Sequence, residues 1–160
     1  MALKDSGWSP QNDEDSYRSG VGVGSGIGGL ASIEKTALLL NEKGPRRVSP
    51  FFIPGALINL AAGQISIKNN LKGPNLAAVT ACASGSHSIG EGAQMIKNNK
   101  ADVMLVGGAE AAICPIGMAG FSASRALSTN FNDNPEKASR PYDRDRDCLL
   151  YTSDAADDKQ

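Results

Sequence analysis

The stretch VTACASG, residues 79–85, decides the fold of this chain, because it places a cysteine where a strand gives way to a helix. Residues 75–81 are mostly apolar and follow Gly73-Pro74, a pattern typical of a short buried strand. From residue 83 onward the apolar positions recur with a helical period, as Ile89 and Ile96 illustrate. Cys82 is therefore predicted to lie at or near a helix N-terminus.

A cysteine in that position has a chemical use. Backbone N–H groups at a helix start lack partners within the helix, and the helix dipole there favours a thiolate. Cys82 is accordingly a candidate nucleophile. The alternative is a buried structural cysteine, which behaves as a small apolar residue. The local pattern alone leaves both interpretations open.

In the rest of the chain, short apolar runs typical of strands alternate with segments of helical period. The expected strands are 20–24, 75–81 and 103–106, and the expected helices are 31–41, the run after 83, and 51–64 beyond Pro54. Strands that alternate with helices indicate an α/β protein with a largely parallel sheet.

Composition excludes several classes of protein. A formal net charge of −1 and a pI of about 5.8 give no sign of a nucleic-acid partner. The apolar runs are too short to span a bilayer, and no signal-peptide pattern opens the chain. The 3 cysteines form no CxxC pair, which argues against a disulfide framework or a zinc site. This cysteine usage fits a reducing compartment such as the cytoplasm or an organellar matrix.

Several further motifs accompany the cysteine segment in a fixed order. They are GSGIGG at 24–29, SPFFIP at 49–54, TACASGSHSIG at 80–90, GGAE at 107–110, RALS at 125–128 and SRPYD at 139–143. This ordered set resembles the β-ketoacyl-[acyl carrier protein] synthases, the elongating condensing enzymes of fatty-acid synthesis. The resemblance runs from about Met1 to Asp147.

The resemblance implies a thiolase-like layered fold built from two duplicated halves. The chain would hold most of the first half, with a mixed, mostly parallel sheet. By the same resemblance, a central strand that this chain does not encode would lie between the strands at 20–24 and 103–106. The second half, which carries two catalytic histidines, a lysine and a phenylalanine gate, would also be missing.

The resemblance also implies a reaction. Cys82 would take an acyl chain as a thioester, and malonyl-[acyl carrier protein] would lose carbon dioxide to give a carbanion that attacks this thioester. Neither a metal nor a cofactor is expected. Ile27 and Phe121 would line the acyl pocket, and Phe52 would reach toward the acyl pocket of a partner subunit. The parent protein would be a homodimer that pairs through the strand at 75–81.

The expected macromolecular partner is acyl carrier protein, which is acidic and presents its thioester on a phosphopantetheine arm. Arg46, Arg47 and Arg125 match the basic docking positions of the family. Neither a nucleic acid nor a membrane is expected as a partner.

Two other functions compete with this one. The glycine motif at 24–29, with Glu42 downstream, satisfies a dinucleotide-binding pattern, although residues 46–54 do not read as the second strand of that unit. A thiolase is a second alternative, disfavoured by the SPFF and RALS segments. His87 is a poor general base for Cys82, because five residues turn a helix by about 500° and leave the side chains about 140° apart. It is predicted to be a hydrogen-bonded structural histidine, and Glu110 a paired structural acid.

The last residues depart from the family pattern. The run CLLYTSDAADD, from Cys148, resembles the translation of a sequencing-library adapter. Residues 1–147 are therefore taken as the partial family domain, and 148–160 as a tail outside it.

Overall fold

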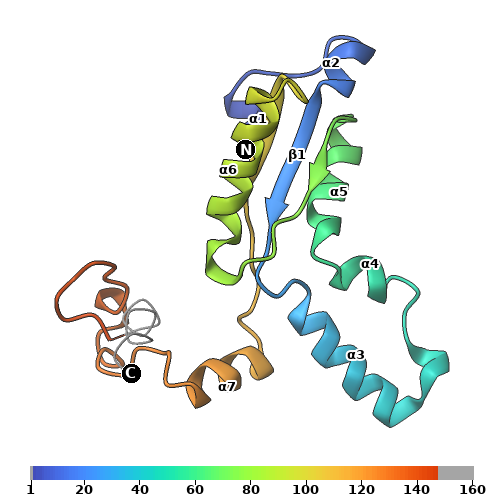
Figure 1. Cartoon of the computed structure of the whole chain (residues 1–160). Helices are drawn as coiled ribbons and strands as arrows, with labels where there is room; N and C mark the ends of the chain where they lie inside the picture. The colour runs from blue at the N-terminus through green and yellow to red at the C-terminus, as the bar shows by residue number, and fades with distance from the viewer. Residues whose placement is uncertain (1, 148–160) are drawn as a thin grey trace, which may run out of the picture. The chain divides into compact units, whose positions relative to one another are not determined.

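The computed structural model describes residues 2–147, so the tail predicted at 148–160 lies outside the described residues. The chain divides into two compact units, residues 1–112 and 113–160. The elements of the first unit are α1 (Ala2–Asp5), α2 (Asp13–Tyr17), β1 (Ser19–Gly24), α3 (Leu30–Lys43), η1 (Pro45–Arg47), α4 (Phe52–Ala56), α5 (Asn59–Asn69), β2 (Asn75–Leu76), η2 (Ala81–Ala83), α6 (Ser84–Lys97) and β3 (Val103–Gly108). They are labelled in Figure 1 where space allows.

The sheet of the first unit has the order β2-β1-β3, and both pairings are parallel. β1 pairs with β3 along its whole length, from Ser19 opposite Val103 to Gly24 opposite Gly108. The expectation of an unfilled position between these two strands is therefore wrong. All six residues of β1 are buried, and unpaired backbone groups there would be costly, so direct pairing satisfies them. The expected antiparallel component of the sheet is absent from residues 2–147.

The strand predicted at 75–81 is shorter than expected. Only Asn75 and Leu76 pair with β1. The chain then stays close to the end of β1, where the Ser25 N–H donates to the Ala78 carbonyl at 3.3 Å. The single helical turn η2 then follows Thr80.

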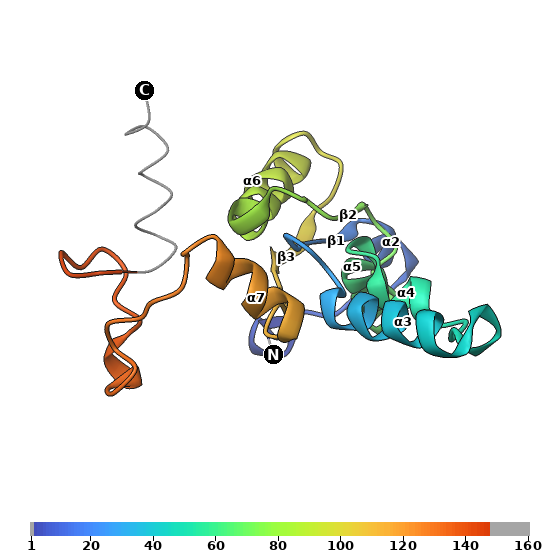
Figure 2. The ribbon, with the colours of Figure 1, turned by 90° about the horizontal axis from the view of Figure 1, so that it is seen from below.

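One face of β1 carries valines and the other carries glycines, and a different helix packs on each face. Val21 and Val23 pack with Ala62 and Leu71 in the buried apolar core, on the α5 side. The alternate glycines face α6, and a Cβ at Gly24 would lie 2.8 Å from the Ser84 carbonyl oxygen. Figure 2 shows α5 and α6 on opposite sides of the strands.

Helix α6 packs through small residues rather than through its isoleucines. Ser84, Ser88 and Gly92 are its buried residues, whereas the side chains of Ile89 and Ile96 are exposed. The apolar periodicity predicted the helix correctly but does not mark the face that packs on this sheet. The short distance between α6 and β3 decides which face packs. Gly92 has no Cβ, and a Cβ added there would lie 2.5 Å from Cγ1 of Val106.

The apolar run at 51–64 forms two helices instead of one. α4 begins at Phe52 and contains Pro54, and it ends at Ala56. Leu57 then adopts extended backbone, and α5 begins at Asn59. The predicted helix at 31–41 is confirmed as α3, which ends before Gly44 at a φ of 76°.

The second unit holds α7 (Pro115–Ala123) and η3 (Pro135–Lys137). Proline at the first position of α7 suits a helix start, since no N–H is needed there. Asp147 Oδ2 accepts hydrogen bonds from the Thr129 and Asn130 N–H groups at 3.0 and 2.9 Å. In the part of the chain that the structure describes, no helix has the length and apolar character needed to cross a membrane.

Candidate active site

Cys82 lies in the single turn η2, directly before α6, and its side chain is exposed. The predicted position at a helix start is therefore confirmed. Ala81, the residue before it, has a φ of 51°, in the left-handed region. That conformation costs an L-residue about 1–2 kcal/mol, so surrounding contacts must hold it.

Ser84 supplies one such contact from beneath the turn. Its buried hydroxyl accepts a hydrogen bond from the Thr80 N–H at 3.0 Å and donates one to the Ala81 carbonyl at 2.7 Å. These two bonds bracket the strained peptide unit on both sides. Sequence reasoning missed this role, although a serine at a helix start is a common signal for such bonds.

Three segments meet at this turn. A Cβ at Gly26 would lie 3.3 Å from the Ala81 backbone, so the glycine loop runs directly against the residue that precedes Cys82. A Cβ at Gly108 would lie 2.8 Å from the Gly85 backbone, so the end of β3 is equally close to the start of α6. The glycines at these positions allow backbone to approach backbone, which brings the glycine loop, the turn that carries Cys82 and the end of β3 together.

Glu110 ties the strand end to the glycine loop. Its carboxylate accepts hydrogen bonds from the Ile27 N–H at 2.8 Å, the Gly28 N–H at 3.2 Å and the Ser25 hydroxyl at 3.1 Å. Burial by itself would raise the pKa of Glu110, but these bonds, with one from Gly26, outweigh burial and lower that pKa below its ordinary value. Glu110 is a structural acid as predicted, with N–H and hydroxyl partners.

This arrangement disfavours the dinucleotide interpretation of the glycine motif. A phosphate would need the loop N–H groups that the Glu110 carboxylate already engages. The carboxylate would also repel a phosphate from the same loop. Glu42 lies at the far end of α3 and has an exposed side chain.

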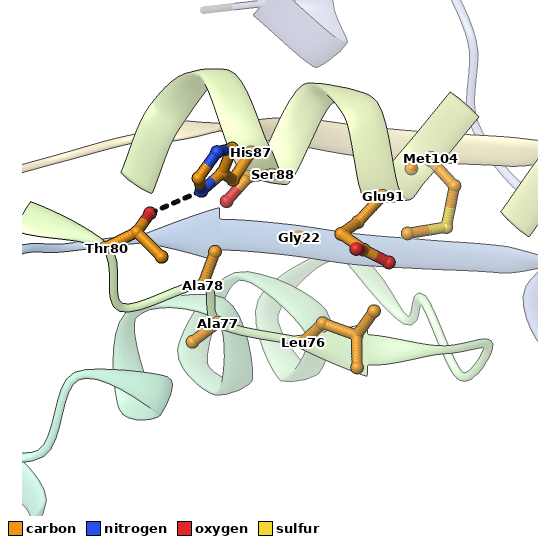
Figure 3. A pocket seen from close by; sticks show the side chains of 10 residues that line it. Gly22, Leu76, Ala77, Ala78, Thr80, His87, Ser88, Glu91 and Met104 are labelled. Atoms are coloured by element: carbon orange, nitrogen blue, oxygen red, sulfur yellow. Dashed lines mark hydrogen bonds between the residues drawn. The ribbon is translucent and has the colours of Figure 1, made fainter. Parts of the chain in front are cut away.

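His87 contacts the turn that carries Cys82 through a side-chain hydrogen bond. Its Nδ1 lies 2.7 Å from the Thr80 hydroxyl, as the dashed line in Figure 3 shows. The prediction of a hydrogen-bonded histidine is confirmed. A cavity of about 420 Å³ borders this bond, between α6 and residues 76–80, with His87, Ser88 and Glu91 on the helix side.

The structure places the other predicted site residues on four segments. Ile27 lies in the glycine loop with 40% of its side chain exposed, and Phe52 is the half-buried first residue of α4. Arg46 and Arg47 are adjacent and exposed in η1. Phe121 is half-buried within α7, in the second unit.

Arg125 belongs to that unit too, directly after α7, and is exposed with a φ of 56°. Within the first unit, the residue before Ile27 lies against the residue before Cys82, since a Cβ at Gly26 would lie 3.3 Å from the Ala81 backbone. Among residues 2–147, no group of three or more His, Cys, Asp or Glu side chains could hold a metal ion.

The sequence model of the family described as "Beta-ketoacyl synthase, N-terminal domain" matches residues 1–149. The chain belongs to this β-ketoacyl synthase family. Its α/β architecture is accordingly that of the thiolase-like ketosynthases.

Curated relatives of this β-ketoacyl synthase chain agree with the family match. The 3-oxoacyl-[acyl-carrier-protein] synthase 2 of Rhizobium meliloti (strain 1021) is 60% identical over 150 residues, which are 94% of this chain and 36% of that protein. The mitochondrial 3-oxoacyl-[acyl-carrier-protein] synthase of Arabidopsis thaliana is 53% identical over 149 residues, 93% of this chain and 32% of that protein. The chain therefore spans about a third of the length of these relatives.

Solved ketosynthases have the same fold. One is a type II PKS ketosynthase, bound to the hexaketide, in complex with its acyl-carrier protein. It superposes with a TM-score of 0.82 at 29% identity, over 92% of this chain and 37% of that one. A β-ketoacyl synthase from Burkholderia phymatum STM815 superposes with a TM-score of 0.79 at 32% identity, over 94% and 36%.

Proposed function

We propose that the whole protein is an elongating 3-oxoacyl-[acyl carrier protein] synthase in which Cys82 is the nucleophile. The observation that carries this proposal is the exposed Cys82 on a strained turn before α6, with the glycine loop packed against Ala81. The family match and the names of the curated relatives support the same reaction.

In the first step, the Cys82 thiolate attacks the carbonyl carbon of an acyl thioester. A sulfur–carbon bond forms to Cys82, and the bond to the carrier's phosphopantetheine sulfur breaks, so that the carrier leaves as a thiol after protonation. The backbone N–H of Cys82 contributes to the oxyanion hole that stabilises the tetrahedral intermediate.

In the second step, malonyl-carrier loses carbon dioxide and leaves a carbanion at its α-carbon. This carbon attacks the Cys82 thioester, a carbon–carbon bond forms, and Cys82 is released as a thiolate. The histidine donors for this step are expected from the second half of the family fold, outside the present chain. By the family resemblance, we propose that Ile27 contacts the acyl chain, that Phe121 does so too, and that Phe52 reaches toward the acyl pocket of a second subunit.

We infer that acyl carrier protein docks at Arg46, Arg47 and Arg125. All three arginines are exposed, and none forms an ion pair with another residue in the range 2–147. One solved relative is a ketosynthase in complex with its acyl-carrier protein, which supports a partner of this kind. Contacts of exposed arginines with an acidic carrier would mainly accelerate and orient its association.

The proposed dimer uses the edge of the sheet. β2 is an outer strand of the sheet, and both of its residues are exposed. An uncovered edge strand offers unpaired backbone groups to another chain, so pairing with its twin across a two-fold axis would satisfy them.

The test uses a full-length chimera, in which residues 1–147 replace the matching segment of the Rhizobium meliloti relative. After incubation with an acyl-carrier substrate, mass spectrometry should find the acyl group on Cys82. The variant Cys82→Ala should take up none, and the matched control Cys114→Ala should be acylated normally, because Cys114 is buried in the second unit. An acyl adduct that persists in Cys82→Ala would contradict the assignment.

A further inference from the structure

The turn that carries Cys82 is held from two sides. Beneath it, Ser84 bonds the backbone of Thr80 and Ala81. From the outer side, the imidazole of His87 bonds the Thr80 hydroxyl at 2.7 Å. The first contact fixes the peptide path, and the second fixes the side chain of the residue at which the turn begins.

The Thr80 side chain is not held in place by packing in addition to its hydrogen bond with His87. The cavity of about 420 Å³ borders both Thr80 and His87, so the side chains around this bond are not closely packed. The neighbours across the cavity, Ala77 and Ala78, are small (Figure 3). The orientation of the Thr80 side chain therefore depends on the hydrogen bond itself.

The backbone at this point is poised to relax. Thr80 has φ −135° and ψ 46°, and Ala81 has a φ of 51°, a conformation that alanine rarely adopts. If the Thr80 side chain is released, only the Ser84 bonds still hold Ala81 in the left-handed region, and Cys82 can shift with it. A small displacement of a nucleophile is enough to slow its attack.

We propose that Thr80 and His87 form a latch that positions Cys82 for acyl transfer, with both acting as positioning residues rather than as acid or base. The inference rests on the proposed function of Cys82. Nδ1 of His87 is engaged by Thr80, and the five-residue spacing places the imidazole about 140° around the helix from the Cys82 side chain, so the ring holds the turn rather than taking the thiol proton.

The experiment compares matched substitutions in the full-length chimera. Thr80→Val keeps the branched shape and removes the hydroxyl, whereas Thr80→Ser keeps the hydroxyl. His87→Leu removes the ring nitrogen, whereas His87→Asn places an amide near the position of Nδ1. The measurements are kcat and KM for acyl transfer, the rate of Cys82 alkylation by iodoacetamide, and the thermal midpoint.

We expect Thr80→Val and His87→Leu each to lower kcat by about tenfold with little change in KM, as for the loss of one hydrogen bond in an attacking geometry. Alkylation of Cys82 should slow in parallel, and Thr80→Ser and His87→Asn should recover most of both rates. The double variant Thr80→Val with His87→Leu should be no slower than either single variant, because both remove the same bond.

Three results would overturn the latch. They are a normal alkylation rate in Thr80→Val, an equal loss in Thr80→Ser, or losses that add in the double variant. If Thr80→Val unfolds, the comparison of His87→Asn with His87→Leu decides in its place. Alkylation requires neither carrier nor acyl group, so failure of the chimera to acylate Cys82 would refute the proposed function while the alkylation ratios still judge the latch.

Discussion

The Glu110 carboxylate accepts a hydrogen bond from the backbone N–H of Ile27 at 2.8 Å, across 83 positions of sequence. This contact joins the end of β3 to the glycine loop, and the loop in turn lies against Ala81 beside the candidate nucleophile. A single acid thus connects the residue proposed to line the acyl pocket with the frame that holds Cys82. The carboxylate of Glu110 thus accepts hydrogen bonds from loop N–H groups, as a bound phosphate does in dinucleotide-binding loops.

Replacement of Glu110 by glutamine should loosen this loop and alter the pH dependence of stability. The folded-state pKa of Glu110 is lowered, so its stabilising contribution is present above the pKa of the unfolded chain and is lost as pH falls through the folded value. Glu110→Gln should therefore lower the thermal midpoint of the full-length chimera at neutral pH. The difference from the unsubstituted protein should shrink as the pH falls through the lowered folded-state pKa, where the native carboxylate protonates.

The matched control for this prediction is Glu42→Gln. Glu42 is exposed at the end of α3, where its Oε1 lies 3.9 Å from Nζ of its neighbour Lys43. Its replacement should leave the thermal midpoint almost unchanged at every pH. Equal effects of Glu42→Gln and Glu110→Gln would show that the glycine loop does not depend on the carboxylate.

An ion pair between Arg18 and Asp102 lies at the start of the sheet. Arg18 bonds Asp102 through Nε at 3.0 Å and through one terminal nitrogen at 2.5 Å, and it also bonds the Asn99 carbonyl at 2.9 Å. A hydrogen bond from Arg18 lowers the pKa of Asp102. The stabilising contribution of Asp102 is therefore present above its unfolded pKa and is lost on acidification through the lower folded value.

A double-mutant cycle with Arg18→Gln and Asp102→Asn tests this contact. Each single variant should lower the thermal midpoint of the chimera modestly, because an exposed ion pair adds little even with two hydrogen bonds. The double variant should be less destabilised than the sum of the singles, since both remove one interaction. Strict additivity at pH 7 would mean that the pair does not join β1 to β3 energetically.

The sequence predicted the position of Cys82 before a helix correctly, for a physical reason. The change from a short apolar run to the helical period around residue 82 is local, and it marks a strand-to-helix junction whatever the remaining chain does. The pairing of β1 with β3 is different, because backbone hydrogen bonds between distant segments leave no pattern in the residues. The family resemblance placed another strand between them, whereas here β1 and β3 pair directly along their whole length.

The packing face of α6 was missed for a related reason. Hydrophobic periodicity ranks Ile89 and Ile96 as the inner face, but Ser84, Ser88 and Gly92 are buried instead. A glycine-lined strand face admits a helix only at short distance, and short distance selects small residues. The hydrogen bonds between Glu110 and the glycine loop were not predicted either. The sequence indicated a paired acid but did not identify its partners.

Charge reversal at Arg46 and Arg47 should separate docking from chemistry. In the full-length chimera, Arg46→Glu with Arg47→Glu should weaken the use of carrier-bound acyl substrate by about tenfold, through a higher KM. Small acyl thioesters that need no docking should react as before. The loss should diminish at high salt, since exposed charges are screened over about 8 Å at physiological ionic strength.

A control with the same change in charge shows whether the position matters. Lys97→Glu with Lys100→Glu alters the exposed end of α6 and should leave the carrier kinetics unchanged. If both pairs reduce carrier use equally, the effect reflects net charge rather than a docking site. Equal losses on carrier-bound and small substrates would instead point to an effect on folding or chemistry.

The 160-residue chain expressed by itself should be aggregated or molten, although its strands pair without a gap. Its buried apolar core is small and consists mainly of Val21, Val23, Ala62 and Leu71. Large apolar side chains lie open on α3, α5 and α6, among them Leu38, Ile67 and Ile89, exposed by 66%, 76% and 56%. Folding must offset roughly 1–2 kcal/mol of backbone entropy per residue, which so small a core does not supply.

Thermal unfolding followed by circular dichroism, together with binding of an apolar dye, checks this prediction. The isolated chain should bind the dye and lack a cooperative transition, whereas the full-length chimera should unfold cooperatively and bind little dye. Polar replacement of Leu38, Ile67 and Ile89 in the isolated chain should reduce aggregation without creating a cooperative transition, because it removes exposed apolar surface but adds no core. A single sharp transition in the unsubstituted 160-residue chain would show that the small core and the β1–β3 pairing suffice for a native fold.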